Sequence, residues 1–268
     1  MGNYKISVIM AVYNSEKFLN ESINSILNQT FKNFEFIIIN DCSTDNSLKI
    51  IKEFIKKDKR IKLINNKKNF GAAGTRNKGL KIAKGKYIAI LDSDDLALKK
   101  RLEIQFNYLE KNPHIFLVGS SAIYIDEKGK EIRRFRKYND YKILAWRLPK
   151  SCSIIHSSAM FRNTKDISYN ENFRSAHDYN FYLDLLDKGE NLTNLPQFLT
   201  KYRVHPDSIS VAKKKEQQRF ANAIKERHKN LRNKISFFNK LKYSIKLVLF
   251  YLRTFNEKRI KNVKTQYP

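Results

Sequence analysis

Short apolar runs alternate with segments of helical periodicity through the first hundred residues of the chain. The runs SVIMAV, FEFIIIN and KYIAIL are continuous rather than alternating, which is typical of parallel strands buried on both faces. Between them, apolar residues recur at helical spacing in residues 16–27 and 47–55. The pattern predicts parallel βαβ units with helices on both faces of a sheet, and it places strands at 6–12, 34–40, 61–65 and 87–91.

The rest of the chain has a less regular pattern. Residues 98–111 have helical periodicity, residues 116–125 are typical of a strand, and a turn is expected at Gly129. No internal repeat or low-complexity linker is present in the sequence. With 268 residues, of which 41% are hydrophobic, the chain can build a substantial core in one large domain or in a domain with an appendage.

The cysteine count and the lack of long apolar segments indicate a cellular location. Two cysteines, Cys42 and Cys152, form neither a disulfide framework nor a Cys-rich zinc site, which favours a reducing compartment. The start MGNYKISVIM lacks the basic and apolar regions of a signal peptide. The longest uncharged apolar run near the C-terminus, 247–252, is far below the roughly 20 residues that span a bilayer. We therefore expect a cytoplasmic protein without a transmembrane helix.

Polar and acidic residues gather where the predicted strands end. Ligands of open parallel sheets bind beyond the carboxyl ends of the strands, so these residues form the candidate site. The chain has a formal net charge of +27, yet its strand ends would place negative charge where a ligand is expected. The four segments are YNS (13–15), DCSTD (41–45), NFG (69–71) and DSDD (92–95).

Three carboxylates are crowded on the turn that follows the fourth predicted strand. Asp92, Asp94 and Asp95 would repel one another strongly without a counter-ion. Hard oxygen ligands favour Mg²⁺ or Mn²⁺, which typically takes one or two carboxylates and fills its other positions with water and phosphate oxygens. The alternative is a capping turn at a helix start. The position at a strand's carboxyl end favours the metal site.

The second and third strand ends offer polar contacts to a ligand. Asp41 can accept two hydrogen bonds from a base or a ribose, although it could instead cap the next helix, as Asp45 and Ser43 could. Small residues in 69–79 would let a ligand approach the backbone, and Arg76 could hold a phosphate with its planar fork. Neither G-x-G-x-x-G nor G-x-x-x-x-G-K-[ST] occurs, which argues against a Rossmann dehydrogenase and a P-loop NTPase.

Four separated segments together match the pattern of a known family: SVIMAVYN (7–14), NDCSTD (40–45), NFGAAGTRN (69–77) and LDSDD (91–95). They resemble the opening strand, the nucleotide-contacting loop, the loop that follows it and the D-x-D metal motif of family 2 glycosyltransferases with a GT-A fold. With later motifs, the resemblance covers about residues 6–210. Ala11 stands where many relatives have Pro, which removes a backbone restriction but no functional group.

The resemblance implies a fold, a donor and a cofactor. The implied fold is the α/β GT-A nucleotide-diphospho-sugar transferase fold, with a mostly parallel central sheet flanked by helices. The donor would be a nucleotide-diphosphate sugar, with UDP favoured by analogy, and Mn²⁺ or Mg²⁺ would clamp its diphosphate. Metal contacts are then expected from Asp94, Asp92, Asp95 and His205. Donor contacts are expected from Ala11, Tyr13, Asn14, Asp41, Asn69, Gly71, Arg76, Asp92, Ser93, Asp94 and Arg203.

Two later segments carry the other residues that the resemblance implies. Asp178, in SAHDYNFYLDLL, is similar to the aspartate that deprotonates the acceptor hydroxyl in inverting transfer, although His177 replaces the acid usually found before it. The alternative makes Asp178 an ordinary carboxylate at a helix N-terminus. In YRVHPDSIS, Arg203 and His205 resemble residues that close over the diphosphate or the metal, whereas a lone His is often structural.

The C-terminal segment has a charge pattern of its own. Residues 212–268 carry 17 Lys or Arg against three Glu, about half of the excess positive charge. We therefore expect a GT-A catalytic domain at 1–211, with a nucleotide-binding half at 1–95 and an acceptor half at 96–211, and a basic helical extension at 212–268. If 235–255 is helical, one face is apolar, which suits an anionic membrane surface. The alternatives are packing on the domain or on a partner in a homodimer. The apolar face contains Phe238, Leu241, Ile245, Val248, Leu249 and Leu252.

Three functions remain after this reading of the sequence. The leading one is an inverting, metal-dependent glycosyltransferase that uses a saccharide or lipid-linked acceptor in cell-surface polysaccharide or lipopolysaccharide synthesis, at the cytoplasmic face of a membrane. A Mg²⁺-dependent nucleotidyltransferase would also need carboxylates and a nucleotide, but the segments around Asp178 and Arg203 favour glycosyl transfer. The +27 charge motivates a nucleic-acid-binding protein, against which stand the acidic strand ends, so no nucleic-acid partner is expected.

Overall fold

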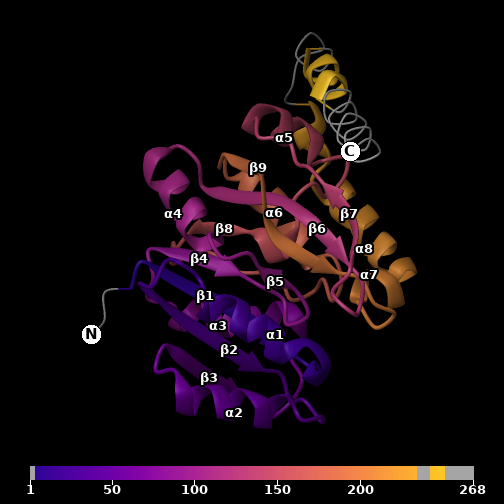
Figure 1. Ribbon diagram of the computed structural model, residues 1–268. Helices are drawn as coiled ribbons and strands as arrows, with labels where there is room; N and C mark the ends of the chain where they lie inside the picture. Colours follow the sequence, from indigo (N-terminus) through magenta and orange to yellow (C-terminus); the bar gives the residue numbers. More distant parts are fainter. Residues whose placement is uncertain (1–3, 234–241, 251–268) are drawn as a thin grey trace, which may run out of the picture.

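Four parallel strands form the first part of one sheet, in the order β3-β2-β1-β4 (Figure 1). The computed structural model describes residues 4–233 and 242–250. The predicted strands are confirmed, except that the fourth ends at Ile90, one residue earlier than expected. We call these strands and the helices between them the parallel half. The strands are β1 (Ile6–Val12), β2 (Phe34–Asn40), β3 (Ile61–Asn65) and β4 (Tyr87–Ile90).

The sheet continues beyond β4 as a mixed sheet, in the order β4-β8-β6-β9-β5. Strand β7 lies off this path and pairs with the C-terminal part of β6. Only the β6–β9 pair is parallel in this second part, which we call the mixed half. The expectation of a mostly parallel sheet is therefore wrong for the mixed half. One cause is the tight turn at Gly129 (φ 81°), because short connections join antiparallel strands only. The strands are β5 (Leu96–Ala97), β6 (Leu117–Ile125), β7 (Glu131–Phe135), β8 (Met160–Arg162) and β9 (Leu192–Arg203).

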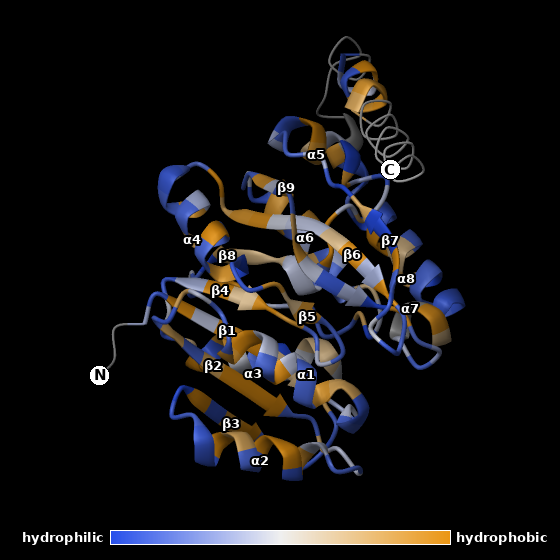
Figure 2. Ribbon diagram, viewed as in Figure 1, coloured by the Kyte–Doolittle hydropathy of each residue, from blue (hydrophilic) through white to orange (hydrophobic). Residues whose placement is uncertain are grey.

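Helices cover both faces of the sheet. Successive residues of a strand point to opposite faces, so Val8 packs with the side chains of α1, α2 and α4, and Ile9 packs with those of α3 and α6. Figure 2 shows the resulting apolar strands in the middle of the molecule. The α-helices are α1 (Glu16–Leu27), α2 (Ser47–Lys57), α3 (Gly71–Ile82), α4 (Arg101–Lys111), α5 (Tyr141–Arg147), α6 (His177–Asp187), α7 (Ile209–Ala212) and α8 (Lys214–Arg227). Two 3₁₀ segments are η1 (His156–Ser158) and η2 (Lys229–Asn233).

Two helices begin where the sequence pattern did not predict. The predicted helix at 98–111 starts at Arg101, because β5 pairs with β9 and the Leu98 N–H donates to the Leu199 carbonyl at 2.9 Å. Most of the segment 69–77, which resembles a loop of the family, belongs to α3. A Cβ added at Gly79 would lie 2.9 Å from Ile9 Cγ2, so small residues allow this helix to pack closely on the sheet.

The first part of the basic extension packs on the mixed half. Helix α8 lies against α6, with Ile224 buried and the rings of Phe173 and Phe220 in edge contact at 5.9 Å. Directly after this helix, His228 Nδ1 is hydrogen-bonded to Asp187 of α6. The first helix of the extension therefore packs on the catalytic domain, while the alternatives stated for 235–255 and the expected boundary at residue 211 stay predictions.

Residues 242–250 form a separate helical segment of the extension. Leu247 is buried, whereas Ile245, Val248 and Leu249 are 53%, 57% and 50% exposed. Within the described ranges, no helix is both long and apolar enough to cross a bilayer. Three members of the predicted apolar face lie outside the described residues: Phe238, Leu241 and Leu252.

Candidate active site

The three carboxylates on the turn that follows β4 have different partners. Asp95 is buried, and its Oδ1 accepts the Arg203 N–H at 2.7 Å. Burial and then the charges of Asp94 and Asp92 raise the pKa of Asp95 well above its usual range. Asp92 is paired with Arg76, and Ser93 Oγ lies 2.7 Å from Ser15 Oγ on the neighbouring strand end. Each carboxylate therefore has its own environment.

The side chain of Asp92 is held ionised by its partner. Burial acts to raise the pKa of this carboxyl, but the charge of Arg76 and the hydrogen bonds from Ser157 and Arg76 together outweigh it, and the pKa falls to about 2. Arg76 is itself buried and also contacts His177 Nε2, at the start of α6. Arg76 therefore joins the end of β4 to the mixed half, and the expected contact of Arg76 with a donor phosphate stays a prediction.

Asp94 and His205 approach each other from two segments distant in sequence. His205 Nε2 lies 3.0 Å from Asp94 Oδ2, and the ring of His205 packs on Phe18 with centroids 4.8 Å apart. His205 Nδ1 is buried and has no hydrogen-bond partner among the described residues. The predicted meeting of these two side chains is therefore seen in the structure.

Asp94 and His205 fit a divalent cation. The Asp94 side chain is 28% exposed, and its carboxylate faces the imidazole nitrogen that would be a second ligand. In the described part of the chain, no three His, Cys, Asp or Glu side chains converge as a complete metal cluster. This matches Mg²⁺ or Mn²⁺, which are typically held by one or two protein ligands together with substrate phosphates. The buried position of Asp95 and the ion pair of Asp92 leave Asp94 as the available carboxylate.

Arg203 supports the turn that follows β4 through hydrogen bonds. Its guanidinium donates to the Asp94 carbonyl at 2.8 Å, to two carbonyls of the β6–β7 turn, and to the Glu21 carboxylate at 2.8 Å. The arginine is 1% exposed and lies 4.6 Å from the ring of Phe18. The structure thus gives Arg203 a supporting position under Asp94, and its expected contact with a donor stays a prediction.

The other predicted donor residues lie at the ends of β1, β2 and β3. Asp41 is buried and accepts the N–H groups of Phe70 and Gly71, both at 2.9 Å, so it fixes the start of α3 instead of capping α2. Gly71 has φ 73°, the left-handed region that favours glycine. The Asn69 Oδ1 also accepts the Gly71 N–H at 2.9 Å. These contacts preform a narrow turn at the sheet edge.

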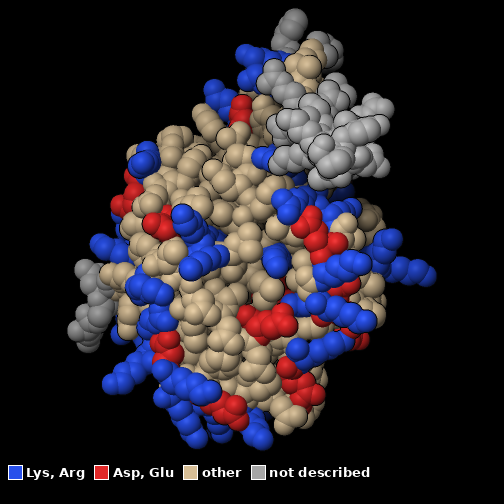
Figure 3. Space-filling model, in the orientation of Figure 1, with Lys and Arg blue, Asp and Glu red and all other residues tan. Residues whose placement is uncertain are grey.

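The end of β1 is tied to the end of β2. Asn14 Oδ1 accepts the Thr44 N–H at 2.8 Å, and the Asn14 N–H donates to Ser43 Oγ at 3.1 Å. Tyr13, beside them, is 52% exposed. Ala11 lies in β1, next to its last residue, and pairs with Ile39 of β2. The structure therefore brings the predicted residues of the first two strand ends to one edge. A compact group of acidic side chains also lies over the region of α1 and β5 in Figure 3, amid scattered Lys and Arg.

Asp178 lies in the first turn of α6, after Ala176 in the left-handed region (φ 60°). Its side chain is partly buried, and removal from water raises the pKa of this carboxyl. The charges of Arg76 and Asp92 act on it across the site, in opposite directions. Asp178 is therefore close enough to Arg76 and Asp92 to respond to their charges, and its predicted role as the base stays a prediction.

Residues 7–169, more than half of the chain, match glycosyl transferase family 2. The chain belongs to this family. Family membership makes the chain an enzyme that transfers glycosyl groups. Nucleotidyl transfer, the other enzyme activity considered from the sequence, is not the activity of this family.

Three known proteins illustrate the relationship. The chain is 38% identical to an uncharacterized glycosyltransferase of Methanocaldococcus jannaschii, over 93% of this chain and 89% of that protein. It is 36% identical to the UDP-Glc:alpha-D-GlcNAc-diphosphoundecaprenol beta-1,3-glucosyltransferase WfgD of Escherichia coli, over 82% and 85%. The fold resembles a mannosyltransferase of Pyrobaculum calidifontis solved with GDP-Man and Mn²⁺, with a TM-score of 0.64, 16% identity, and 82% of this chain and 64% of that one covered. The GT-A fold is confirmed.

A buried polar cluster behind the glycosyltransferase site was missed by the sequence reading. His156 Nδ1 lies 2.7 Å from Tyr182 Oη, and His156 Nε2 lies 3.2 Å from Tyr169 Oη. Burial and then the charge of Arg76 lower the pKa of His156 to about 3, so this histidine is neutral. His156 sits in the serine-rich segment SCSIIHSS, which has no periodic spacing that would predict a buried polar cluster.

Proposed function

We propose that this family 2 glycosyltransferase is an inverting, metal-dependent enzyme that moves a sugar from a nucleotide-diphosphate donor, with UDP favoured, to a saccharide or lipid-linked acceptor. The observation that carries the proposal is a chain of contacts: His205 meets Asp94, and Arg76 pairs with Asp92 of the same turn and contacts His177, the residue before Asp178. The name of the Escherichia coli relative, which specifies UDP-Glc and a diphosphoundecaprenol-linked acceptor, supports both substrate classes. Such acceptors belong to cell-surface polysaccharide or lipopolysaccharide synthesis.

Each residue of the site has a role in this reaction. Asp94 and His205 would hold Mn²⁺ or Mg²⁺, which when bound neutralises charge on the leaving diphosphate. Asp178 takes the proton of the acceptor hydroxyl as its oxygen forms a bond to the anomeric carbon. The bond from that carbon to the diphosphate oxygen breaks, and the nucleoside diphosphate leaves with the bonding electrons. Attack from the face opposite the leaving group inverts the anomeric configuration.

A thermal-shift experiment tests the donor and the metal together. Full-length protein is heated with UDP, GDP or their sugars, with and without Mn²⁺, because a ligand of the native state raises the melting temperature. We expect a Mn²⁺-dependent shift with a uridine nucleotide. Asp94→Asn should abolish the Mn²⁺-dependent part, and Asp207→Asn, which removes an equal charge from the exposed loop after His205, should keep it. A wild-type protein that responds to no nucleotide, or an Asp94→Asn protein that responds like wild type, contradicts the proposal.

We further propose that the enzyme works at the cytoplasmic face of a membrane as a peripheral protein. Support comes from the exposed apolar side chains of 245–249 and from the net basic charge of the extension. A lipid-linked acceptor would be presented at that surface. A homodimer through the same face is the alternative arrangement, and vesicle binding separates the two, as described in the Discussion.

A further inference from the structure

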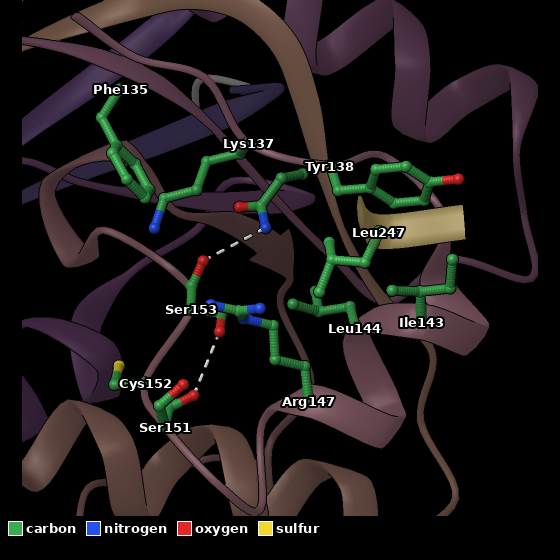
Figure 4. A pocket seen from close by; sticks show the side chains of 11 residues that line it. Phe135, Lys137, Tyr138, Ile143, Leu144, Arg147, Ser151, Cys152, Ser153 and Leu247 are labelled. Carbon is green, nitrogen blue, oxygen red and sulfur yellow. Dashed lines mark hydrogen bonds between the residues drawn. The ribbon is translucent and has the colours of Figure 1, made fainter. Parts of the chain in front are cut away.

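A pocket separate from the metal-binding turn lies between β7, α5 and the helical segment 242–250 (Figure 4). Its empty volume is about 450 Å³, part of it open to solvent. None of the described residues that line it belongs to the donor site or the base. The lining residues are Phe135, Lys137, Tyr138, Ile143, Leu144, Arg147, Ser151, Cys152, Ser153, Asn194 and Leu247.

One side of the pocket is cationic. Figure 4 shows Lys137 and Arg147 extending toward the loop that carries Ser153. The Lys137 ammonium lies 4.6 Å from the Phe135 ring centroid and has no ion-pair or hydrogen-bond partner among the described residues. No Asp or Glu occurs among the described residues of the lining. The half-buried Lys137 ammonium would therefore be stabilised by a bound anion.

The charge of Lys137 responds to this environment. Burial lowers the pKa of its ammonium to about 8, and the nearby charge of Arg147 acts in the same direction. At neutral pH most of the lysine is still protonated. An anion bound in the pocket would raise that pKa again, because an opposite charge favours the protonated form.

Another side of the pocket is apolar. Ile143, Leu144 and Leu247 lie together there in Figure 4. Leu247 is buried against this wall. A ligand with an anionic end and a hydrocarbon chain would therefore find both partners in one pocket.

The pocket adjoins the catalytic aspartate. Tyr179, the residue after Asp178, donates its hydroxyl to the Leu148 carbonyl at 2.8 Å, which ties the first turn of α6 to the end of α5. Cys152, in the lining, has a pKa raised by the surrounding protein and then by the charge of Asp178, while Lys137 acts on the same thiol in the opposite sense.

We propose that this pocket binds the phosphate-bearing, apolar end of the acceptor, a phosphate or diphosphate group esterified to a hydrocarbon chain. The assignment rests on the proposed function, since it supplies the site for a lipid-linked acceptor. Lys137 and Arg147 contact the phosphate oxygens, and Leu144 and Leu247 contact the first carbons of the chain. The sugar carried on the diphosphate then points toward Asp178.

The test measures binding of farnesyl diphosphate to the full-length protein by titration calorimetry, in EDTA so that the donor site holds no metal. Lys137→Gln should weaken binding by about tenfold or more, because a charge-assisted contact is lost. Lys137→Arg should keep the affinity within about threefold. Lys130→Gln, which removes an exposed charge from the nearby β6–β7 turn, should leave the affinity unchanged and serves as the matched control. Unchanged melting temperatures show that the variants are folded.

Two further probes separate a lipid phosphate from a free phosphate. Pyrophosphate has no chain and should bind more weakly than farnesyl diphosphate, while farnesol has no phosphate and its binding should not respond to Lys137. Leu247→Ala should reduce the advantage of farnesyl diphosphate over pyrophosphate. Equal affinity of the two diphosphates in wild type and Leu247→Ala overturns the lipid assignment, and equal effects of Lys137→Gln and Lys130→Gln overturn the pocket.

Failure of the pocket can be told apart from failure of the proposed function. The thermal shift with UDP and Mn²⁺ is measured on the same Lys137→Gln protein and should equal that of wild type, since Lys137 lies outside the donor site. A normal nucleotide response without Lys137-dependent binding of farnesyl diphosphate rejects the pocket alone. Lys137-dependent binding without any nucleotide response rejects the glycosyl-donor proposal, and with it the role of the pocket as an acceptor site.

Discussion

The carboxyl ends of the parallel strands and the core of the mixed half hold polar groups in different ways. At the carboxyl ends of the parallel strands, polar side chains bind nearby backbone, as Asp41 does with the N–H groups of Phe70 and Gly71. In the mixed half, polar side chains also lie inside the core and bind one another, as His156 does with Tyr182. Figure 2 shows a related contrast, with β2 strongly apolar and β6 paler. The carboxyl ends are the edge of a parallel sheet at which a ligand reaches polar groups.

Arg76 connects the parallel half to the mixed half, and we call this residue the joint. It belongs to α3, its guanidinium pairs with Asp92 after β4, and it contacts His177 at the start of α6. The turn after β4 and the residue before Asp178, the proposed base, are therefore connected through one buried side chain. Changes at the base, at the joint, in the buried cluster and on the outer helix should affect the protein in that order of size.

The largest effect is expected at Asp178, which tests whether the mixed half performs the chemistry. Asp178→Asn should lower the transfer rate on the order of 10² to 10⁴, because the acceptor proton loses its base. Donor binding, measured by the Mn²⁺-dependent thermal shift, should not change. Asp207→Asn, at an exposed position, is the control and should transfer normally. Near-normal turnover in Asp178→Asn would assign the base to another acid, with Asp184 and Asp187 examined first.

The next largest effect is expected from removing the joint. Arg76→Met leaves Asp92 without its buried cation and should lower the free energy of unfolding by about 3 kcal/mol. Arg134→Met also breaks an ion pair, but both partners are about half exposed, so its cost should stay below about 1 kcal/mol. Urea unfolding of the two variants measures the difference. Equal losses would mean that the two halves do not depend on the Arg76 contact.

The contrast between the halves also explains what could be read from the sequence. Continuous apolar runs and polar residues after them follow from burial on both faces, so β1 to β4 and the grouping of Asp41 with Asp92 were predictable. The pairing of β8 with β4, and the placing of His156 beside Tyr182, depend on contacts between distant segments that have no periodic signature. The meeting of Asp94 and His205 was reached only through the family resemblance.

Acid sensitivity should come from the mixed half. The pKa of His156 is lowered to about 3, so between pH 7 and 5 the unfolded chain takes up a proton that the folded chain does not. Stability should fall by about 2 kcal/mol over that interval from this histidine alone. The lowered pKa of Asp92, by contrast, lowers stability only below about pH 4.

The pH dependence is checked by urea unfolding at pH 7 and pH 5. His156→Gln should be less stable than wild type at pH 7 but should lose about 2 kcal/mol less on acidification. His114→Gln, at an exposed position, should keep the wild-type pH dependence. His177, whose pKa is also lowered by burial and by Arg76, leaves a residual acid sensitivity in the His156 variant. An identical pH dependence in wild type and His156→Gln would show that His156 is already solvated in the folded state.

The smallest effect is expected on the outer surface of the helical segment 242–250, where the proposal of membrane binding can be tested without touching either half. Val248 and Leu249 are exposed, and their replacement by Ser should weaken cosedimentation with anionic vesicles by about threefold to tenfold. Ile132→Ser removes an equally exposed apolar side chain from β7 and should bind like wild type.

Salt separates the two forces that would hold this surface to a bilayer. Raising the ionic strength screens the attraction of Lys and Arg to anionic lipid and leaves apolar burial in place, so wild-type binding should weaken without vanishing. The Val248 and Leu249 double variant lacks much of the apolar part, and its residual binding should therefore fall almost to zero at high salt. Equal binding by wild type and variant at both salt concentrations would place the membrane contact elsewhere. Absence of vesicle binding by either protein would favour a homodimer through this face, because the exposed side chains would then need a second copy of the chain to cover them.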